Sequence, residues 1–152
     1  MLSLKNISKS FKQRGLVLNN LSLEVSEGDS IAIMGPSGSG KSTLLNIIGL
    51  LDKPDSGDIW FKGSPVAQFT DDESASYRNR NIGFVFQDRL LLAHLTVSEN
   101  IFLPLLASKY RKDELSVRED HLKLLMEKTG IIDIKDKYPF HISGGEAQRV
   151  AV

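Results

Sequence analysis

A glycine-rich loop between an apolar segment and a helical segment is the feature that most constrains how this chain can fold. The loop, residues 35–42, reads Gly-Pro-Ser-Gly-Ser-Gly-Lys-Ser and matches the pattern G-x-x-x-x-G-K-[ST]. Before it, residues 31–34 are apolar on both faces, as expected of a central parallel strand. After it, the apolar residues between 44 and 51 predict a buried helix that is broken at Pro54. The sequence therefore predicts an α/β fold in which strand, loop and helix follow one another directly.

This loop also predicts a ligand. Backbone N–H groups at such a helix start converge on one anion, and a polyphosphate is the natural ligand. Lys41 is expected to reach the β- and γ-phosphates, and the Ser42 hydroxyl is expected to complete a Mg²⁺ shell. The predicted binding residues are Gly35, Pro36, Ser37, Gly38, Ser39, Gly40, Lys41, Ser42 and Thr43. A purely structural glycine turn is the alternative, but it would not require a lysine followed by Ser42-Thr43.

The rest of the chain predicts a β-rich start and a helical second half. Strands are expected from alternating or continuous apolar residues at 2–7, 18–25, 58–61 and 81–86. Thr70 and Thr96 are each followed three residues later by glutamate, which predicts two helix starts with capping boxes. A long helix is expected from Asp113 to Thr129, ended by Gly130, and a last helix is expected to begin near Glu146.

Composition excludes several classes of function. Lysine plus arginine equal aspartate plus glutamate at 19 each, so nothing predicts a nucleic-acid partner. The chain has no cysteine, which excludes disulfides and thiolate sites and favours a cytoplasmic setting. No apolar stretch approaches the roughly 20 residues of a membrane-spanning helix. The three histidines have no metal-ligand spacing and are assigned no role.

A second glycine turn follows about a hundred residues downstream. Residues 142–146 read Ile-Ser-Gly-Gly-Glu and precede a helical segment, so they predict a second anion site, with an ordinary helix cap as the alternative. Together the two motifs resemble those of ATP-binding-cassette ATPases, whose signature motif typically reads Leu-Ser-Gly-Gly-Gln. Ile142 and Glu146 depart conservatively from that pattern. The resemblance extends over essentially the whole chain.

The resemblance implies a P-loop NTPase core with an N-terminal antiparallel β subdomain and an α-helical subdomain, incomplete at the C-terminus. It divides the chain into residues 1–88, 89–141 and 142–152. In this family two cassettes pair head to tail, so Ser143, Gly144 and Gly145 would contact the ATP of the partner.

Two further positions match the family. Gln87 resembles the glutamine that positions magnesium and the attacking water and that links to the transport subunit. Phe11 falls where the family places an aromatic ring on adenine, and a flat π face suffices for stacking. The simpler alternatives are a solvated loop amide for Gln87 and a core phenylalanine for Phe11.

The implied function is that of the ATPase subunit of a transporter. As a homodimer or cassette pair it would bind ATP and Mg²⁺ and drive a separate membrane permease from the inner face of the cell membrane. Segments such as Gly49-Leu50-Leu51-Asp52 and Leu103-Pro104-Leu105-Leu106 are similar to the branch that serves lipoprotein release and macrolide export. The family's catalytic glutamate and histidine do not occur before Val152, so we expect a cut cassette that does not turn over ATP alone.

Two other hypotheses remain open at this point. In the first, the chain is a small self-contained P-loop ATPase or kinase in which residues 84–88 form the magnesium-binding strand and Asp88 holds the metal. The preceding Gln87 and the otherwise unexplained turn at 143–145 argue against it. In the second, the chain is a truncated nucleotide-binding module that regulates the transporter without hydrolysis.

Overall fold

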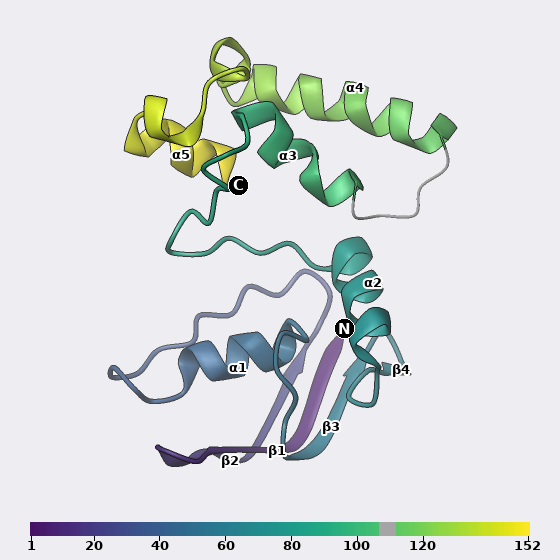
Figure 1. Ribbon diagram of the computed structural model, residues 1–152. Coiled ribbons are helices and arrows are strands. Elements are labelled where there is room, and N and C mark those ends of the chain that lie inside the picture. Colours follow the sequence, from purple (N-terminus) through teal and green to yellow (C-terminus); the bar gives the residue numbers. More distant parts are fainter. Residues whose placement is uncertain (107–111) are drawn as a thin grey trace. The chain divides into compact units, whose positions relative to one another are not determined.

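The computed structural model describes residues 1–106 and 112–152, which form two compact units, Met1–Ile82 and Gly83–Val152 (Figure 1). The first unit contains β1 (Leu2–Phe11), β2 (Gly15–Val25), α1 (Lys41–Ile48), β3 (Ser56–Phe61), β4 (Ser64–Pro65) and α2 (Asp71–Asn81). The second contains α3 (Val97–Leu106), α4 (Lys112–Lys128), the short turns η1 (Ile132–Ile134) and η2 (Pro139–His141), and α5 (Gly144–Val150). The division expected from the sequence, into 1–88, 89–141 and 142–152, stays a prediction.

A four-stranded antiparallel sheet, in the order β2-β1-β3-β4, forms the framework of the first unit. Leu4 of β1 pairs with Leu23 of β2 on one side and with Ile59 of β3 on the other. Figure 1 shows α1 lying along one face of this sheet. The core between them consists of Leu4, Ile7, Leu18, Leu44, Ile47, Ile59 and Val66. The β-rich start predicted by the alternating apolar residues, and the antiparallel β subdomain implied by the family resemblance, are therefore confirmed.

The end of β1 is tied to the segment between α1 and β3. The Lys9 ammonium lies 2.7 Å from a carboxylate oxygen of Asp52 and donates to the carbonyl of Lys53 at 2.6 Å. One residue further on, the Ser10 N–H donates to the Asp55 carboxylate at 2.7 Å. These contacts join parts of the chain that are more than forty residues apart in sequence. They hold the C-terminal end of β1 in place, where Phe11 leads into the β1–β2 hairpin.

The helix after the glycine loop is shorter and less buried than the sequence predicts. It ends at Ile48, and Gly49 caps it, so that Leu50 already lies in the left-handed region at φ 54°. Leu44 and Ile47 are buried against the sheet, but the side chain of Leu45 is 53% exposed. The expectation of a helix buried on most sides was therefore wrong, because only the sheet-facing side of α1 is covered.

Two strands expected from apolar runs do not form. Residues 31–34 lie outside the sheet, and Ile31 and Met34 are 47% and 87% exposed. Residues 82–86 have no regular structure; Val85 is 61% exposed, and the rings of Phe84 and Phe86 stack with centroids 5.4 Å apart. A strand needs a neighbour for its hydrogen bonds. In the part of the chain that the structure describes, neither segment pairs with another strand.

The second unit is built from helices around its own apolar core. Val97, Met126, Ile131, Ile134 and Val150 are its buried members. Helix α4 begins at residue 112 and ends at 128, close to the bounds expected from the sequence, and the following glycine has a positive φ of 66°. The N–H of Val97 donates to the carbonyl of Lys137 at 2.8 Å, which joins the start of α3 to the segment before α5. No helix among the residues described here could span a lipid bilayer.

Both capping boxes predicted from the sequence are present. The Thr70 N–H donates to the Glu73 carboxylate at 2.8 Å, and the Glu73 N–H donates to the Thr70 hydroxyl at 3.3 Å. Thr96 and Glu99 make the same pair of hydrogen bonds at 2.7 and 3.3 Å. In each case the backbone and side-chain donors of threonine hold the glutamate pKa below its ordinary value. The ionised carboxylate is therefore the form that supports the start of the helix.

This arrangement predicts how α2 responds to acid. Because the folded-state pKa of Glu73 lies below its unfolded value of about 4.3, its stabilising effect is complete above that pH. The effect disappears as the pH falls through the lowered folded pKa. We expect Thr70→Ala to raise the Glu73 pKa and to flatten the acid limb of the stability curve, as measured by NMR titration and urea unfolding. Ser76→Ala, a change in the same helix outside the capping box, should leave the Glu73 pKa unchanged.

Candidate functional site

The glycine loop passes directly into α1 through a backbone conformation that favours glycine. Gly40 has a φ of 92° and stands at the N-cap position of the helix. A Cβ at this residue would lie 3.0 Å from side-chain carbons of both Val17 and Leu18. The end of the loop therefore packs closely against β2.

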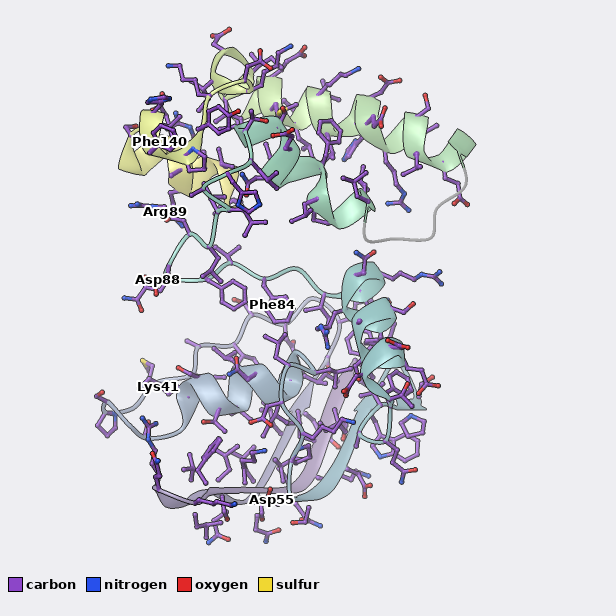
Figure 2. The ribbon with its side chains drawn as sticks, in the orientation of Figure 1. Lys41, Asp55, Phe84, Asp88, Arg89 and Phe140 are labelled. Carbon is purple, nitrogen blue, oxygen red and sulfur yellow. The ribbon has the colours of Figure 1, made fainter. Side chains whose placement is uncertain are left out.

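Lys41 closes the loop with its own side chain. Its Nζ donates to the carbonyl of Gly35 at 2.8 Å and to that of Pro36 at 2.7 Å (Figure 2). A lysine ammonium has three donors, so one N–H remains for a further acceptor. The positive charge is thereby held over the loop at the N-terminus of an eight-residue helix, where the helix dipole also favours an anion.

Ser42 offers an oxygen beside this charge. The residue is exposed, and its hydroxyl has no hydrogen-bond partner among the described residues. A hydroxyl is a suitable Mg²⁺ ligand when phosphates and water supply the remaining oxygens. The described residues contain no group of three or more histidine, aspartate or glutamate side chains placed to hold a metal by themselves. The chemistry of this donor therefore fits a magnesium ion that arrives with a polyphosphate.

A shallow pocket of about 430 Å³ lies between the β1–β2 hairpin and the first turn of α1. It is lined by Phe11, Lys12, Gln13, Arg14 and Thr43. Phe11 is 38% exposed and is therefore not a core residue, and the Lys9 ammonium lies 5.4 Å from its ring centroid. Thr43 lies in the first turn of α1, one residue after the glycine loop ends, so the pocket borders the loop. Our reading of the sequence missed the three polar lining residues, although their position directly after Phe11 was a usable signal.

The other predicted residues belong to the second unit. Gln87 is exposed in the irregular segment between α2 and α3. Residues 143–145 lie at the start of α5. Within the first unit, Phe11 and Thr43, which directly follows the glycine loop, line the same pocket.

The turn at residues 142–146, which we call the signature turn, is a capping box. The Ser143 Oγ accepts from the Glu146 N–H at 3.3 Å, and the Ser143 N–H donates to the Glu146 carboxylate at 2.6 Å. The Ser143 backbone and side-chain hydrogen bonds lower the Glu146 pKa most, and the charges of Lys137 and Arg149 add to the effect. Ser143 thus acts as the helix cap that the sequence offered as an alternative. Its hydroxyl proton remains available for donation to a ligand.

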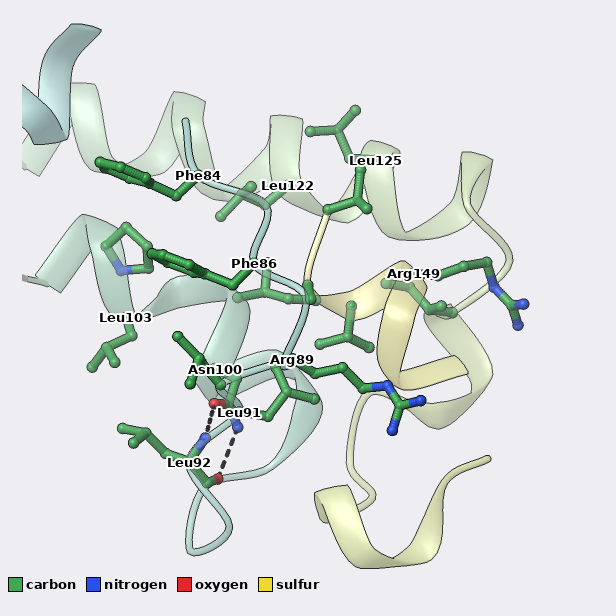
Figure 3. Close-up of a pocket in the computed structure, with 17 residues that line it drawn as sticks. Phe84, Phe86, Arg89, Leu91, Leu92, Asn100, Leu103, Leu122, Leu125 and Arg149 are labelled. Atoms are coloured by element: carbon green, nitrogen blue, oxygen red, sulfur yellow. Dashed lines mark hydrogen bonds between the residues drawn. The ribbon is translucent and has the colours of Figure 1, made fainter. Parts of the chain in front are cut away.

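A second cavity, of about 410 Å³, lies within the helical unit (Figure 3). Its lining is mainly apolar and includes Phe84, Phe86, Leu103, Leu122 and Leu125. Asn100 holds the loop on one side, because its side chain accepts from the Leu92 N–H at 2.7 Å and donates to the Leu92 carbonyl at 3.1 Å. The ionisable residues in this lining are Arg89 and Arg149.

Comparison with known proteins places these features in a family context. The family model for the ABC transporter matches residues 18–152. The lipoprotein-releasing system ATP-binding protein LolD 1 of Rhodopirellula baltica is 43% identical over 100% of the chain, which spans 66% of that relative. The macrolide export ATP-binding/permease protein MacB of Chlorobaculum tepidum is 42% identical to the chain. The match covers 100% of the chain and 23% of the MacB protein.

A solved structure gives the same result for the fold. The dimeric structure of MJ0796, a bacterial ABC transporter cassette, is 36% identical, with a TM-score of 0.85 over 100% of the chain and 67% of the cassette. This likeness confirms the α/β P-loop NTPase fold, with its antiparallel sheet and its helical part, that the sequence predicts. The chain spans about two thirds of the length of LolD 1 and of the MJ0796 cassette.

Proposed function

The chain belongs to the ABC transporter family, and from this premise we propose that it is the ATP-binding subunit of a transporter. In the full-length dimer it would couple the binding and hydrolysis of MgATP to transport, or to lipoprotein release, by a separate membrane permease. The observation that carries the proposal is the Lys41 ammonium, held over the glycine loop by the carbonyls of Gly35 and Pro36. A positive charge fixed at a helix N-terminus is suited to the β- and γ-phosphates of a nucleotide.

The proposed site is composite. Residues 35–43 of one subunit bind the triphosphate, Ser42 supplies one Mg²⁺ ligand, and the Phe11 ring stacks on adenine. Residues 143–145 of a second copy close on the same nucleotide from the opposite side, in a head-to-tail pair. A bound magnesium ion would supply positive charge to offset that of the phosphates, and Gln87 would orient the attacking water. The proposal assigns hydrolysis to the full-length dimer, because electrostatic positioning by further groups dominates phosphoryl transfer.

The permease partner and the membrane location follow from the same proposal. The names of LolD 1 and MacB connect them with lipoprotein release and macrolide export. We infer a subunit of that branch, cytoplasmic and held peripherally at the inner face of the membrane by its permease. A stand-alone ATPase built on Asp88 is less well supported, since residues 84–86 do not form the strand that it requires.

The composite site can be tested at Ser143. Ser143→Asp keeps a good helix cap but places a negative charge where a phosphate would bind. We expect it to abolish self-association driven by MgATP, whereas Ser143→Thr, which retains the hydroxyl, should associate within about threefold of the unchanged chain. Analytical ultracentrifugation with MgATP, and with MgADP as the reference, measures this. Association of the Asp variant at the level of the unchanged chain would leave Ser143 with a capping role only.

A further inference from the structure

The C-terminal end of α1 is closed by a backbone turn in which a leucine takes the place usually held by glycine. The Leu51 N–H donates to the Asn46 carbonyl at 2.8 Å. The Leu50 N–H donates to the Ile47 carbonyl at 3.1 Å, which completes the two bonds of a Schellman motif. Leu50 stands at the left-handed position of this motif, with a φ of 54°. Because a Cβ is unfavourable in that region, the end of α1 is strained and needs support from its surroundings.

The support comes from α2. The Arg78 guanidinium donates from Nη1 to the Leu50 carbonyl at 2.6 Å and joins residues that are 28 positions apart. The last carbonyls of a helix carry partial negative charge, so a cation at this end also interacts favourably with the dipole of α1. Arg78 is half-buried. Leu50 and Arg78 line one pocket of about 450 Å³ together with Asp52, Lys53 and Asp71.

A second contact between α2 and the same segment is weaker. The Lys53 ammonium lies 3.5 Å from the Asp71 carboxylate, but the two side chains are 57% and 99% exposed. Exposed ion pairs contribute little to stability, whereas a half-buried hydrogen bond from a charged donor contributes more. Of these two contacts, the bond from Arg78 therefore does more to hold α2 against the end of α1.

This bond connects the two ends of the candidate nucleotide site. Helix α1 is a single hydrogen-bonded helix of eight residues that begins at Lys41, so a constraint at its last turn also restricts its first. Helix α2 ends at Asn81, and the chain then runs on to Gln87. We propose that Arg78 is a positioning residue that couples occupation of the glycine loop to α2, the helix that precedes Gln87. This inference rests on the proposed function, which places a phosphate at the N-terminal end of α1.

The coupling has a measurable consequence, because a ligand suppresses every opening of the chain that destroys its site. At a MgATP concentration of about 100 times the dissociation constant, such openings become about a hundredfold rarer. The buried residue of α2 is Ser74, and a helix with so little burial exchanges its amide hydrogens through local opening. If that opening breaks the bond from Arg78 and releases the end of α1, MgATP will slow exchange in α2 as well.

Amide hydrogen exchange of the full chain, with and without MgATP, tests this. In the unchanged chain we expect MgATP to slow exchange in residues 71–81 about tenfold or more. In Arg78→Ala the slowing should fall below about twofold, while residues 35–43 remain protected. Arg80→Ala, which removes the same charge from an exposed position of α2, should behave like the unchanged chain. Arg78→Lys, which keeps a donor, should show an intermediate slowing and serves as the test if Arg78→Ala does not fold.

Thr70→Ala separates coupling from the stability of α2. It removes the capping box and makes the helix open more readily, but it leaves the bond from Arg78 to Leu50 in place. We therefore expect faster exchange in α2 of this variant, still slowed by MgATP about tenfold or more. In every protein the MgATP concentration is set to the same multiple of the dissociation constant measured by calorimetry.

The outcomes distinguish this inference from the proposed function. If MgATP does not protect residues 35–43 of the unchanged chain, the proposed function fails. If it protects them but does not slow α2, or slows α2 equally in Arg78→Ala, the role of Arg78 is refuted and the glycine-loop site stands. Loss of the slowing in Thr70→Ala to the same extent as in Arg78→Ala would show that only helix stability matters, which also refutes the coupling.

Discussion

Replacing Lys41 with alanine should lower the affinity of the chain for MgATP at least about a hundredfold. The ammonium is held over the loop by two carbonyls, at 2.8 and 2.7 Å, and is the positive side chain placed at the centre of the predicted phosphate site. Each hydrogen bond from a charged donor contributes about 1.5–3 kcal/mol, and the side chain is expected to reach two phosphates. Isothermal titration calorimetry with MgATP measures the loss.

The matched control for this change is Lys5→Ala. Lys5 is an exposed lysine on β1, and its replacement removes the same charge from the first unit without touching the loop. We expect its MgATP affinity to stay within about twofold of the unchanged chain. If Lys41→Ala binds as tightly as the control, the glycine loop does not hold phosphate and the proposed function is wrong.

Replacing Gly57 with alanine should destabilise the first unit by about 3 kcal/mol. Gly57 is the second residue of β3 and has a φ of 100°, at the point where β3 pairs with the irregular part of β1 between Lys5 and Ser8. A Cβ there would lie 2.6 Å from the backbone carbonyl oxygens of both Lys5 and Asn6. Rigid backbone atoms cannot move aside as a flexible side chain can, so the steric cost adds to that of the unfavourable φ.

Gly63→Ala separates the two contributions. Gly63 has a similar φ of 83°, but a Cβ there would meet no atom within 4 Å. Its replacement should therefore cost only about 1 kcal/mol, the conformational part alone. The single tryptophan, Trp60, lies on β3 and reports urea unfolding of this unit by fluorescence. Equal losses for the two variants would contradict a close approach of β3 to β1.

Local features of the fold could be predicted because their partners lie within a few residues. The capping boxes that begin at Thr70 and Thr96 each join groups three positions apart. The glycine turn at 143–145 was recognised for the same reason, although the capping role of Ser143 was then only the alternative.

Other features depend on residues far away in the chain and could not be read from local patterns. The segments 31–34 and 81–86 were predicted as strands, but a strand exists only where another segment accepts and donates its backbone hydrogen bonds. The pocket beside Phe11 needs the β1–β2 hairpin to approach Thr43 of α1.

The sequence by itself determined the family, the glycine loop that leads into α1 and the starts of the helices, since these depend on residue types at fixed short spacings. Tertiary structure alone decided that only one side of α1 is buried and that residues 31–34 and 82–86 form no strand. The physical reason is the same in both cases. Burial and strand pairing are set by which distant segments pack together, and no local pattern in the sequence encodes that.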